Sequence, residues 1–176
     1  KYHEQAYAYH VNLSSPHPYE SNPLTWLFMI RPTSMYYVGS KLNENGCPVD
    51  SCSSAITGIG NPLIWWAAGI AALYLYYRLI RHREWQVGFI LLGLAAGYLP
   101  WLGYLNRTVF QFYSIAFEPF LILGLTWCIG LILGSRTDPW YRRDRGVLTV
   151  AVYLAVVGIV SAFYYPLMTG MQVPFW

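Results

Sequence analysis

The sequence predicts an all-α integral membrane protein, with four transmembrane helices that follow an extracytoplasmic N-terminal segment. The chain has 176 residues, of which 56% are hydrophobic and 11% are charged, whereas soluble domains carry roughly 25% charged residues. The apolar residues gather in runs long enough to cross a bilayer. Aromatic residues make up 18%, and Trp and Tyr favour membrane–water interfaces. The net charge of +3 comes from arginines beside the apolar runs, which does not indicate a nucleic-acid partner.

Four apolar runs give the expected spans, at about residues 62–77, 85–104, 108–133 and 147–165. A span needs roughly 20 residues, and the third run is long enough to tilt. Asn61 and the proline after it open the first span, and Pro166 is expected to end the fourth. The chain therefore divides into an N-terminal segment, residues 1–60, and a four-helix transmembrane region, residues 61–176.

The arginines predict the orientation of the spans. Two short loops hold most of the basic residues, and the opposite side of the membrane holds only four, spread over a much longer stretch. Cytoplasmic loops carry an excess of Lys and Arg. The two arginine loops are therefore expected in the cytoplasm, with the N-terminal segment and the C-terminus outside the cell membrane. The loops contain Arg78, Arg81, His82 and Arg83, and Arg136, Arg142, Arg143 and Arg145; the other side has Lys1, Arg31, Lys41 and Arg107.

The N-terminal segment contains a short apolar stretch, residues 24–30, that cannot span a membrane. Asn22 can cap a helix there, and Pro23 suits its first position. We expect a short amphipathic helix on the membrane surface, ending at Arg31 before Pro32. An ordinary helix of the protein core is the alternative.

Residues 35–38 favour a strand, and residues 43–46 have the composition of a turn. Cys47 and Cys52 follow, and such a pair can form a disulfide, remain as free thiols or supply half of a metal site. Only two ligands are visible, and an oxidising compartment favours the disulfide. Cys128 is expected to be inert packing. His3, His10 and His17 recur every seven residues, but prolines interrupt the pattern, so no metal site is expected.

Arg107 is the first candidate for a binding role. It lies in a very short outer turn between Trp101 and Phe110. A guanidinium there can hold a lipid-linked phosphate in a bidentate manner and keeps its charge at any physiological pH. The alternative is that Arg107 reaches ordinary lipid headgroups.

Glu118 is the second candidate, because an ionisable group inside a span usually faces a cavity or the protein interior. Gln111 and Ser114 share its face if the third span is one continuous helix, and Tyr113 lies close by. This face can border a polar substrate cavity. A structural hydrogen bond to a neighbouring helix is the alternative. Residues 17–21 form a polar loop at the membrane surface.

The chain contains none of the short motifs that bind nucleotides, activate serine or ligate catalytic zinc. It also has no visible pair of carboxylates, so no complete acid–base machinery can be assembled from it. The chain begins with Lys1, and a polar stretch before four spans is typical of a piece of a longer protein. Part of the chemistry is therefore expected outside these residues.

The order of the motifs resembles the C-terminal four-span region of the protein O-mannosyltransferases in their actinobacterial form. The resemblance runs from about His17 to Trp176. Its motifs are His17-x-Tyr19-x-Ser21-x-Pro23-x-x-Trp26, Arg31-Pro32, Gly60-Asn61-Pro62-x-x-Trp65-Trp66, Gly97-Tyr98-Leu99-Pro100-Trp101, Arg107-Thr108-x-Phe110-x-Phe112-Tyr113, Glu118-Pro119-Phe120 and Tyr165-Pro166-Leu167-x-Thr169-Gly170.

The resemblance implies a membrane glycosyltransferase of the GT-C type. Such an enzyme transfers mannose from polyprenyl phosphate mannose to Ser or Thr hydroxyls of secreted proteins, at the outer membrane face and without a cofactor. The family's catalytic Asp lies in the first outer loop of the N-terminal half, and this chain has no matching segment. The chain is therefore expected to be inactive alone and to need that half. Its other expected partners are membrane lipid, the lipid-linked donor, secreted acceptor proteins and the secretion channel.

Arg107 falls on an arginine position of the family pattern, so the resemblance implies contact with the donor phosphate. Trp101 and Tyr113 would lie around the sugar. Glu118 departs from the family pattern, which leaves its role open. Two further hypotheses remain: another GT-C transferase with a different lipid-linked sugar, or a non-catalytic membrane scaffold that kept the helices and lost the active half.

Overall fold

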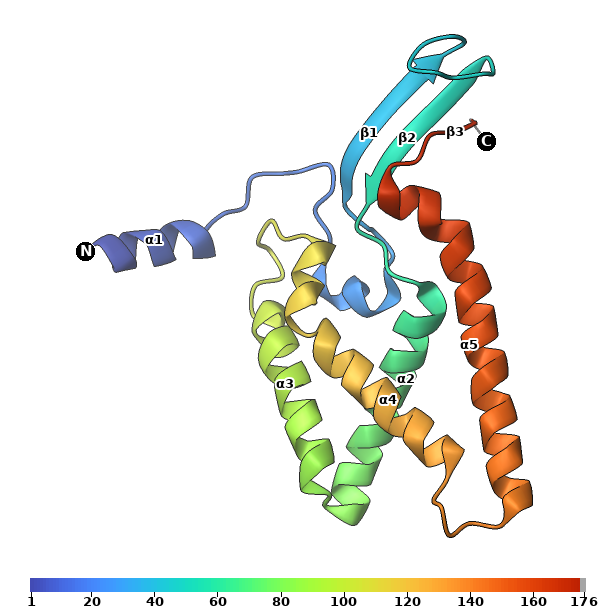
Figure 1. The fold of residues 1–176 in the computed structure, drawn as a ribbon. Coiled ribbons are helices and arrows are strands. Elements are labelled where there is room, and N and C mark those ends of the chain that lie inside the picture. The colour runs from blue at the N-terminus through green and yellow to red at the C-terminus, as the bar shows by residue number, and fades with distance from the viewer. Residues whose placement is uncertain (175–176) are drawn as a thin grey trace.

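The computed structural model describes residues 1–174, so Trp176 of the sequence pattern lies outside the described residues. Five helices and a small sheet make up the fold (Figure 1). The helices are α1 (Tyr2–Val11), α2 (Pro62–His82), α3 (Trp85–Leu102), α4 (Glu118–Leu133) and α5 (Trp140–Thr169), with two 3-10 helices, η1 (Pro23–Phe28) and η2 (Gln111–Ala116). The strands are β1 (Ser34–Lys41), β2 (Ser51–Thr57) and β3 (Val173–Pro174).

Helices α2, α3 and α4 pack against one another, and α5 runs along one side of them with contacts to α2 and α4 (Figure 1). The sheet lies beyond one end of this bundle, which we call the hairpin end. The α2–α3 turn and the α4–α5 loop lie at the other end, which we call the arginine-rich end. Helix α1 projects sideways from the hairpin end, and none of its residues is buried.

Three helices within residues 1–174, α2, α3 and α5, are long and apolar enough to cross a membrane, and α4 is shorter. At 1.5 Å per residue α4 is about 24 Å long, against a hydrocarbon core of about 30 Å. The expected continuous third span from residue 108 is therefore wrong. The chain instead forms η2, breaks at Phe117 and starts α4 at Glu118. Pro119 explains the break, because a proline is accommodated in the first turn of a helix but not in its middle.

Helix α5 is longer at both ends than the sequence predicts. Its first turns contain Arg142, Arg143 and Arg145, which were expected to lie in a loop, whereas Arg136 does lie in the α4–α5 loop. At the other end the helix continues through Pro166 and stops at Gly170, whose φ is 71°. The expected stop at Pro166 is wrong, because a proline removes one backbone hydrogen bond and need not end a membrane helix.

The sheet adds a β element to the expected all-α architecture, outside the bundle. Strands β1 and β2 form the antiparallel hairpin, and β3 pairs with β2 on its other side. Asn43, Asn45 and Gly46 have positive φ values, as the turn composition predicts. A disulfide joins Cys47 and Cys52, with 5.8 Å between their Cα atoms. The pairing of β3 with β2 holds Val173–Pro174 to the hairpin.

The stretch expected on the membrane surface has one side in the core. Asn22 Oδ1 accepts a hydrogen bond from the Leu24 amide at 3.0 Å, which caps η1 as expected. Trp26 is fully buried, whereas Leu24 and Phe28 are exposed. The segment therefore combines the two sequence-based alternatives: one edge anchors it in the protein, and the other is free for lipid.

The larger hydrophobic cluster lies where η1 meets α2, and it includes Trp26, Trp65 and Phe117. The Trp65 indole donates a hydrogen bond to the Trp26 carbonyl at 3.1 Å. Gly97 allows the chain around Phe117 to approach α3 closely, because a Cβ there would lie 2.9 Å from Phe117 Cβ. Close backbone approach through small residues is typical of membrane helix packing. This cluster fixes the wall on which the candidate site is built.

Candidate functional site

A polar hollow of about 360 Å³ lies at the hairpin end. Three separate parts of the chain form it: the loop before η1, Arg31 after η1, and the turn after α3. Polar groups dominate the lining, although the bundle beneath is apolar. The lining residues are Ser14, Pro16, Glu20, Ser21, Asn22, Arg31, Leu105, Asn106, Arg107 and Thr108.

Hydrogen bonds hold these stretches together. The Thr108 amide donates to the Leu13 carbonyl at 3.0 Å, and the Thr108 hydroxyl donates to the Ser15 carbonyl at 2.6 Å. The Ser21 amide donates to the Val109 carbonyl at 2.9 Å. Thr108 is buried, so these bonds are shielded from competing solvent and the walls are preformed.

Arg107 has the chemistry of an anion-binding group. Its guanidinium carbon lies 5.8 Å from the centroid of the Trp101 ring, which is a cation–π contact. Its Nε atom is buried and has no hydrogen-bond partner within residues 1–174. Such a buried donor is costly to leave unpaired. Arg107 as a whole is half-buried and lines the hollow, so a ligand oxygen there would gain a strong, charge-assisted hydrogen bond from its guanidinium.

Aromatic rings support Arg107 from one side. Trp101 stacks on Tyr113, with ring centroids 4.9 Å apart and planes at 19°. Trp26 meets Trp101 edge to face at 5.7 Å. Because Trp26 is fully buried in the core cluster, it fixes the rings next to Arg107. The structure thus brings Arg107, Trp101 and Tyr113 together, as the sequence analysis expects.

Arg31 shares the hollow with Arg107, which the sequence analysis did not anticipate. Its Nη2 donates to the Pro18 carbonyl at 2.7 Å. Glu20 also lines the hollow, and its Oε2 accepts from the His17 amide at 3.3 Å. Two guanidinium groups and one carboxylate therefore face the same space. No sequence spacing indicated the pair, because the arginines come from segments far apart along the chain.

Tyr104 connects the site to α1. Its hydroxyl lies 3.2 Å from that of Tyr7. This hydrogen bond raises the pKa of Tyr104, and the positive charge of Arg107 acts in the opposite direction. The Tyr104 phenol therefore stays neutral at physiological pH, and the turn that carries Arg107 gains an attachment to the exposed helix.

The expected polar face of Gln111, Ser114 and Glu118 does not exist as one helical face. Gln111 and Ser114 lie in η2 and are buried, with Gln111 only 3% exposed. Glu118 starts α4 on the other side of the break. Its carboxylate has no hydrogen bond or ion pair among the described residues, and it does not line the hollow. The first turn of a helix favours a negative charge, which accounts for Glu118 structurally.

Gln111 carries a buried side-chain oxygen without a partner in the described chain. It is not among the residues that line the hollow. Within residues 1–174, no group of three His, Cys, Asp or Glu side chains is arranged to hold a metal ion. Arg107 and Arg31 are therefore the charged groups with the clearest ligand geometry at this end.

Apolar membrane-length helices define a multi-pass membrane protein, and a polar hollow lined by Arg31 and Arg107 lies at one end of its bundle. The chain belongs to the protein O-mannosyltransferase family: residues 1–174 match the C-terminal four-transmembrane region of these proteins.

Similar proteins include the polyprenol-phosphate-mannose–protein mannosyltransferase of Mycolicibacterium smegmatis, which is 34% identical over 176 residues, covering 98% of this chain and 34% of that protein. The protein of the same name from Mycobacterium tuberculosis is 32% identical, covering 98% of this chain and 33% of that protein. This chain thus spans about a third of the length of the curated relatives it matches.

The fold is similar to that of the Saccharomyces cerevisiae protein O-mannosyltransferase Pmt1–Pmt2 complex bound to the sugar donor. The TM-score is 0.72 at 23% sequence identity, and the match covers 96% of this chain and 23% of that chain. At this identity the similarity establishes the fold of the region. The roles of single residues are argued from the geometry of this chain.

Proposed function

We propose that the chain is the donor-binding C-terminal part of a membrane mannosyltransferase. The whole enzyme would transfer mannose from polyprenyl phosphate mannose to Ser and Thr hydroxyls of secreted proteins, with the hairpin end outside the cytoplasm in the cell membrane. The observation that carries the proposal is the buried, unpartnered Nε of Arg107 at the wall of the polar hollow. Family membership supports the same reading.

The chemistry of the donor fits this end of the bundle. Polyprenyl phosphate mannose has an apolar tail, one phosphodiester and a sugar. The phosphate needs a cation close to the membrane boundary, and Arg107 supplies one that cannot lose its proton. Trp101 and Tyr113 stack on each other beside it, and the sugar would lie near these rings. The lipid tail would leave the hollow toward the membrane.

Arg107 would contribute most when the bond between mannose and phosphate breaks. Negative charge then grows on the leaving phosphate, and a fixed guanidinium stabilises that charge without rearranging. The carboxylate that takes the acceptor proton would come from the N-terminal half of the enzyme. This chain would therefore hold the leaving group, and the other half would activate the acceptor hydroxyl.

Substituting Arg107 tests the proposal in the full-length protein. We expect Arg107→Ala to lower transfer from polyprenyl phosphate mannose to a Ser/Thr-rich peptide by roughly a hundredfold or more, since removal of one charge-stabilising donor commonly has this effect. Arg107→Lys should recover only part of the rate, because an ammonium lacks the bidentate fork. Single-turnover assays in membranes measure the transfer rate of each variant. Lys41→Ala, at an exposed cation on the hairpin, is the matched control.

Donor turnover by Arg107→Ala within a few-fold of the parent would contradict the role of Arg107 in phosphate binding. Two alternative functions are separated in the same membranes. Turnover of a different lipid-phosphate sugar, but not of the mannose donor, would indicate another GT-C transferase. No turnover of any such donor by the unsubstituted, folded protein would favour a membrane scaffold.

A further inference from the structure

A second cavity lies between α2, α4 and α5, with a volume of about 630 Å³. It is a cleft with an apolar lining, in the half of the bundle nearer the arginine-rich end. Small and aliphatic side chains form most of its walls, among them Ala67, Ile70 and Ala71 from α2, Ile132 from α4, and Thr149 and Val150 from α5. The polar hollow of the candidate site lies at the opposite end.

Two close contacts of α5 bracket the cleft. At the arginine-rich end, a Cβ on Gly146 would lie 2.3 Å from the Ile132 carbonyl oxygen, so α5 touches the backbone of α4 there. Toward the hairpin end, the Asn61 amide donates to the Val157 carbonyl at 3.0 Å and to the Ser161 hydroxyl at 2.8 Å. Between these points the cleft separates much of α5 from α2 and α4, and the Tyr153 hydroxyl reaches across to donate to the Leu63 carbonyl at 3.3 Å.

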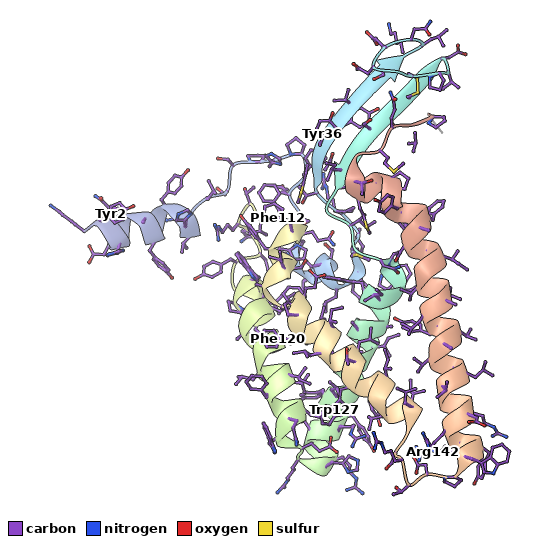
Figure 2. All side chains as sticks on the ribbon, viewed as in Figure 1. Tyr2, Tyr36, Phe112, Phe120, Trp127 and Arg142 are labelled. Carbon is purple, nitrogen blue, oxygen red and sulfur yellow. A yellow bond between two sulfur atoms is a disulfide. The ribbon has the colours of Figure 1, made fainter. Side chains whose placement is uncertain are left out.

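Arginines lie directly beyond the cleft at its arginine-rich end. On α2 the lining residue Tyr74 is followed one turn later by Arg78, whose guanidinium lies 6.0 Å from the Tyr74 ring. On α5 the lining residue Thr149 is preceded one turn earlier by Arg145, whose carbonyl accepts from the Thr149 hydroxyl at 2.8 Å. Figure 2 shows Arg142 at the same end of α5.

Part of this positive charge is uncompensated. Arg78 pairs with Glu84, and Arg142 pairs with Asp138 at 2.8 Å. Arg136, Arg143 and Arg145 are exposed and form no ion pair within residues 1–174. The end of the bundle next to the cleft therefore offers free guanidinium groups.

We propose that this cleft binds an anionic phospholipid, with an acyl chain between α2, α4 and α5 and the headgroup phosphate on the arginines at its mouth. An aliphatic cleft with unpaired guanidinium groups beyond its end is complementary to a molecule that is apolar along one part and anionic at the other. Basic pockets between transmembrane helices are typical sites for anionic lipid headgroups. Arg145 supplies the charge and Thr149 marks the cleft wall next to it.

This site is separate from the proposed transfer of mannose. The donor phosphate would bind at Arg107, at the hairpin end, and the phospholipid would bind at the arginine-rich end. The lipid would fill the cleft between the two close contacts of α5 and would thereby stabilise the packing of α5 against α4.

Lipid binding to the purified full-length protein tests the proposal by native mass spectrometry, with phosphatidylglycerol and phosphatidylcholine as probes. We expect retention of phosphatidylglycerol and a rise in Tm on its addition, with neither effect from phosphatidylcholine. Arg145→Gln should weaken phosphatidylglycerol binding about fivefold, the usual contribution of one basic residue near an anionic surface. Lys41→Gln removes one exposed positive charge at the hairpin end and should leave binding unchanged.

The cleft itself is tested by filling it. Thr149→Trp places a large side chain at the exposed mouth and should abolish retention of phosphatidylglycerol, whereas Leu148→Trp, at an exposed position that does not line the cleft, should not. The proposal would be overturned by equal retention of the two lipids or by unchanged binding to Thr149→Trp. It would also be overturned if cross-linking showed a polyprenyl lipid, or another helix of the full-length protein, in the cleft. Because the readout is lipid binding, the result does not depend on transfer activity.

Discussion

At the scale of single residues, Asn61 joins local and long-range structure through one side chain. Its Oδ1 accepts from the amides of Leu63 and Ile64, which caps α2. Its Nδ2 donates to Val157 and Ser161 on α5. The cap follows from the sequence, because an asparagine before a proline is a common helix start. The contacts with α5 depend on a helix almost a hundred residues away.

Replacing Asn61 should therefore cost more than a helix cap alone. We expect Asn61→Ala to lower the free energy of unfolding by about 1–3 kcal/mol, because it removes the cap and leaves buried backbone groups unpaired. Asn61→Asp keeps the oxygen that caps α2 and loses the amide that donates to α5, so it should separate the loss of the cap from the loss of the contacts with α5. Thermal unfolding of the full-length protein in detergent measures each variant. A loss no larger than that of Asn12→Ala, an exposed control with one local hydrogen bond, would contradict this account.

Arg107 and Glu118 are both candidate site residues, and the structure gives them different surroundings. Both are charged groups near membrane depth, and the sequence analysis proposed a role for each. Arg107 lines the hollow and has an unpaired donor, whereas Glu118 starts a helix and lines neither the hollow nor the cleft next to α5. Their charges were readable from the sequence. Their surroundings were not, because the break at Phe117 moved Glu118 away from Gln111.

At the scale of elements, α5 contains two glycines with opposite roles. Gly146 lies against the backbone of α4, as described above, and a backbone atom cannot rotate out of the way. Gly158 has no atom within 4 Å of the position that a Cβ would occupy. Both glycines lie in the same helix, and the sequence gives no sign of which one is in contact.

The two glycines predict opposite effects of alanine. We expect Gly146→Ala to destabilise the protein by roughly 1–3 kcal/mol, because α5 must move away from α4. Gly158→Ala should be neutral or stabilise it by about 0.5–1 kcal/mol, because alanine restricts the unfolded chain and favours a helix. Thermal unfolding of the two variants, side by side, checks the difference. Equal Tm values would show that α4 and α5 do not meet at Gly146.

At the scale of the whole molecule, the two arginine-rich segments, the α2–α3 turn and the α4–α5 loop with the start of α5, lie at the opposite end of the bundle from the hairpin (Figure 1). The excess of arginine at one end predicts that this end faces the cytoplasm. A disulfide between Cys47 and Cys52 at the other end agrees with an oxidising compartment. Two independent features of the chain therefore predict the same orientation.

Cysteine labelling tests this orientation. In a Cys128→Ser background, we expect Tyr36→Cys, on the exposed face of β1, to react with a membrane-impermeant maleimide in intact cells. Thr137→Cys, in the α4–α5 loop, should react only after the membrane is opened. Both side chains are exposed in the structure, so access to the reagent depends on the side of the membrane. Labelling of Thr137→Cys in intact cells, without that of Tyr36→Cys, would reverse the assignment.

The sequence by itself determined the features that depend on local composition. The membrane class, the positions of α2 and α3, the hairpin turn and the Asn22 and Asn61 caps all follow from apolar runs, proline positions and turn residues. These signals are local because hydrophobicity, capping and backbone preference act over a few neighbouring residues. Arg107 was likewise a candidate from its charge and its flanking aromatic residues.

Only the tertiary structure decided which distant segments meet. In the folded chain α4 begins at Glu118 and α5 continues through Pro166. Arg31 and Arg107 line one hollow, and a cleft lies next to α5. Each outcome depends on packing between segments far apart in the chain. Proline and charge act locally in the sequence, but whether a helix breaks, continues or leaves a guanidinium unpaired depends on the partners that the fold brings to it.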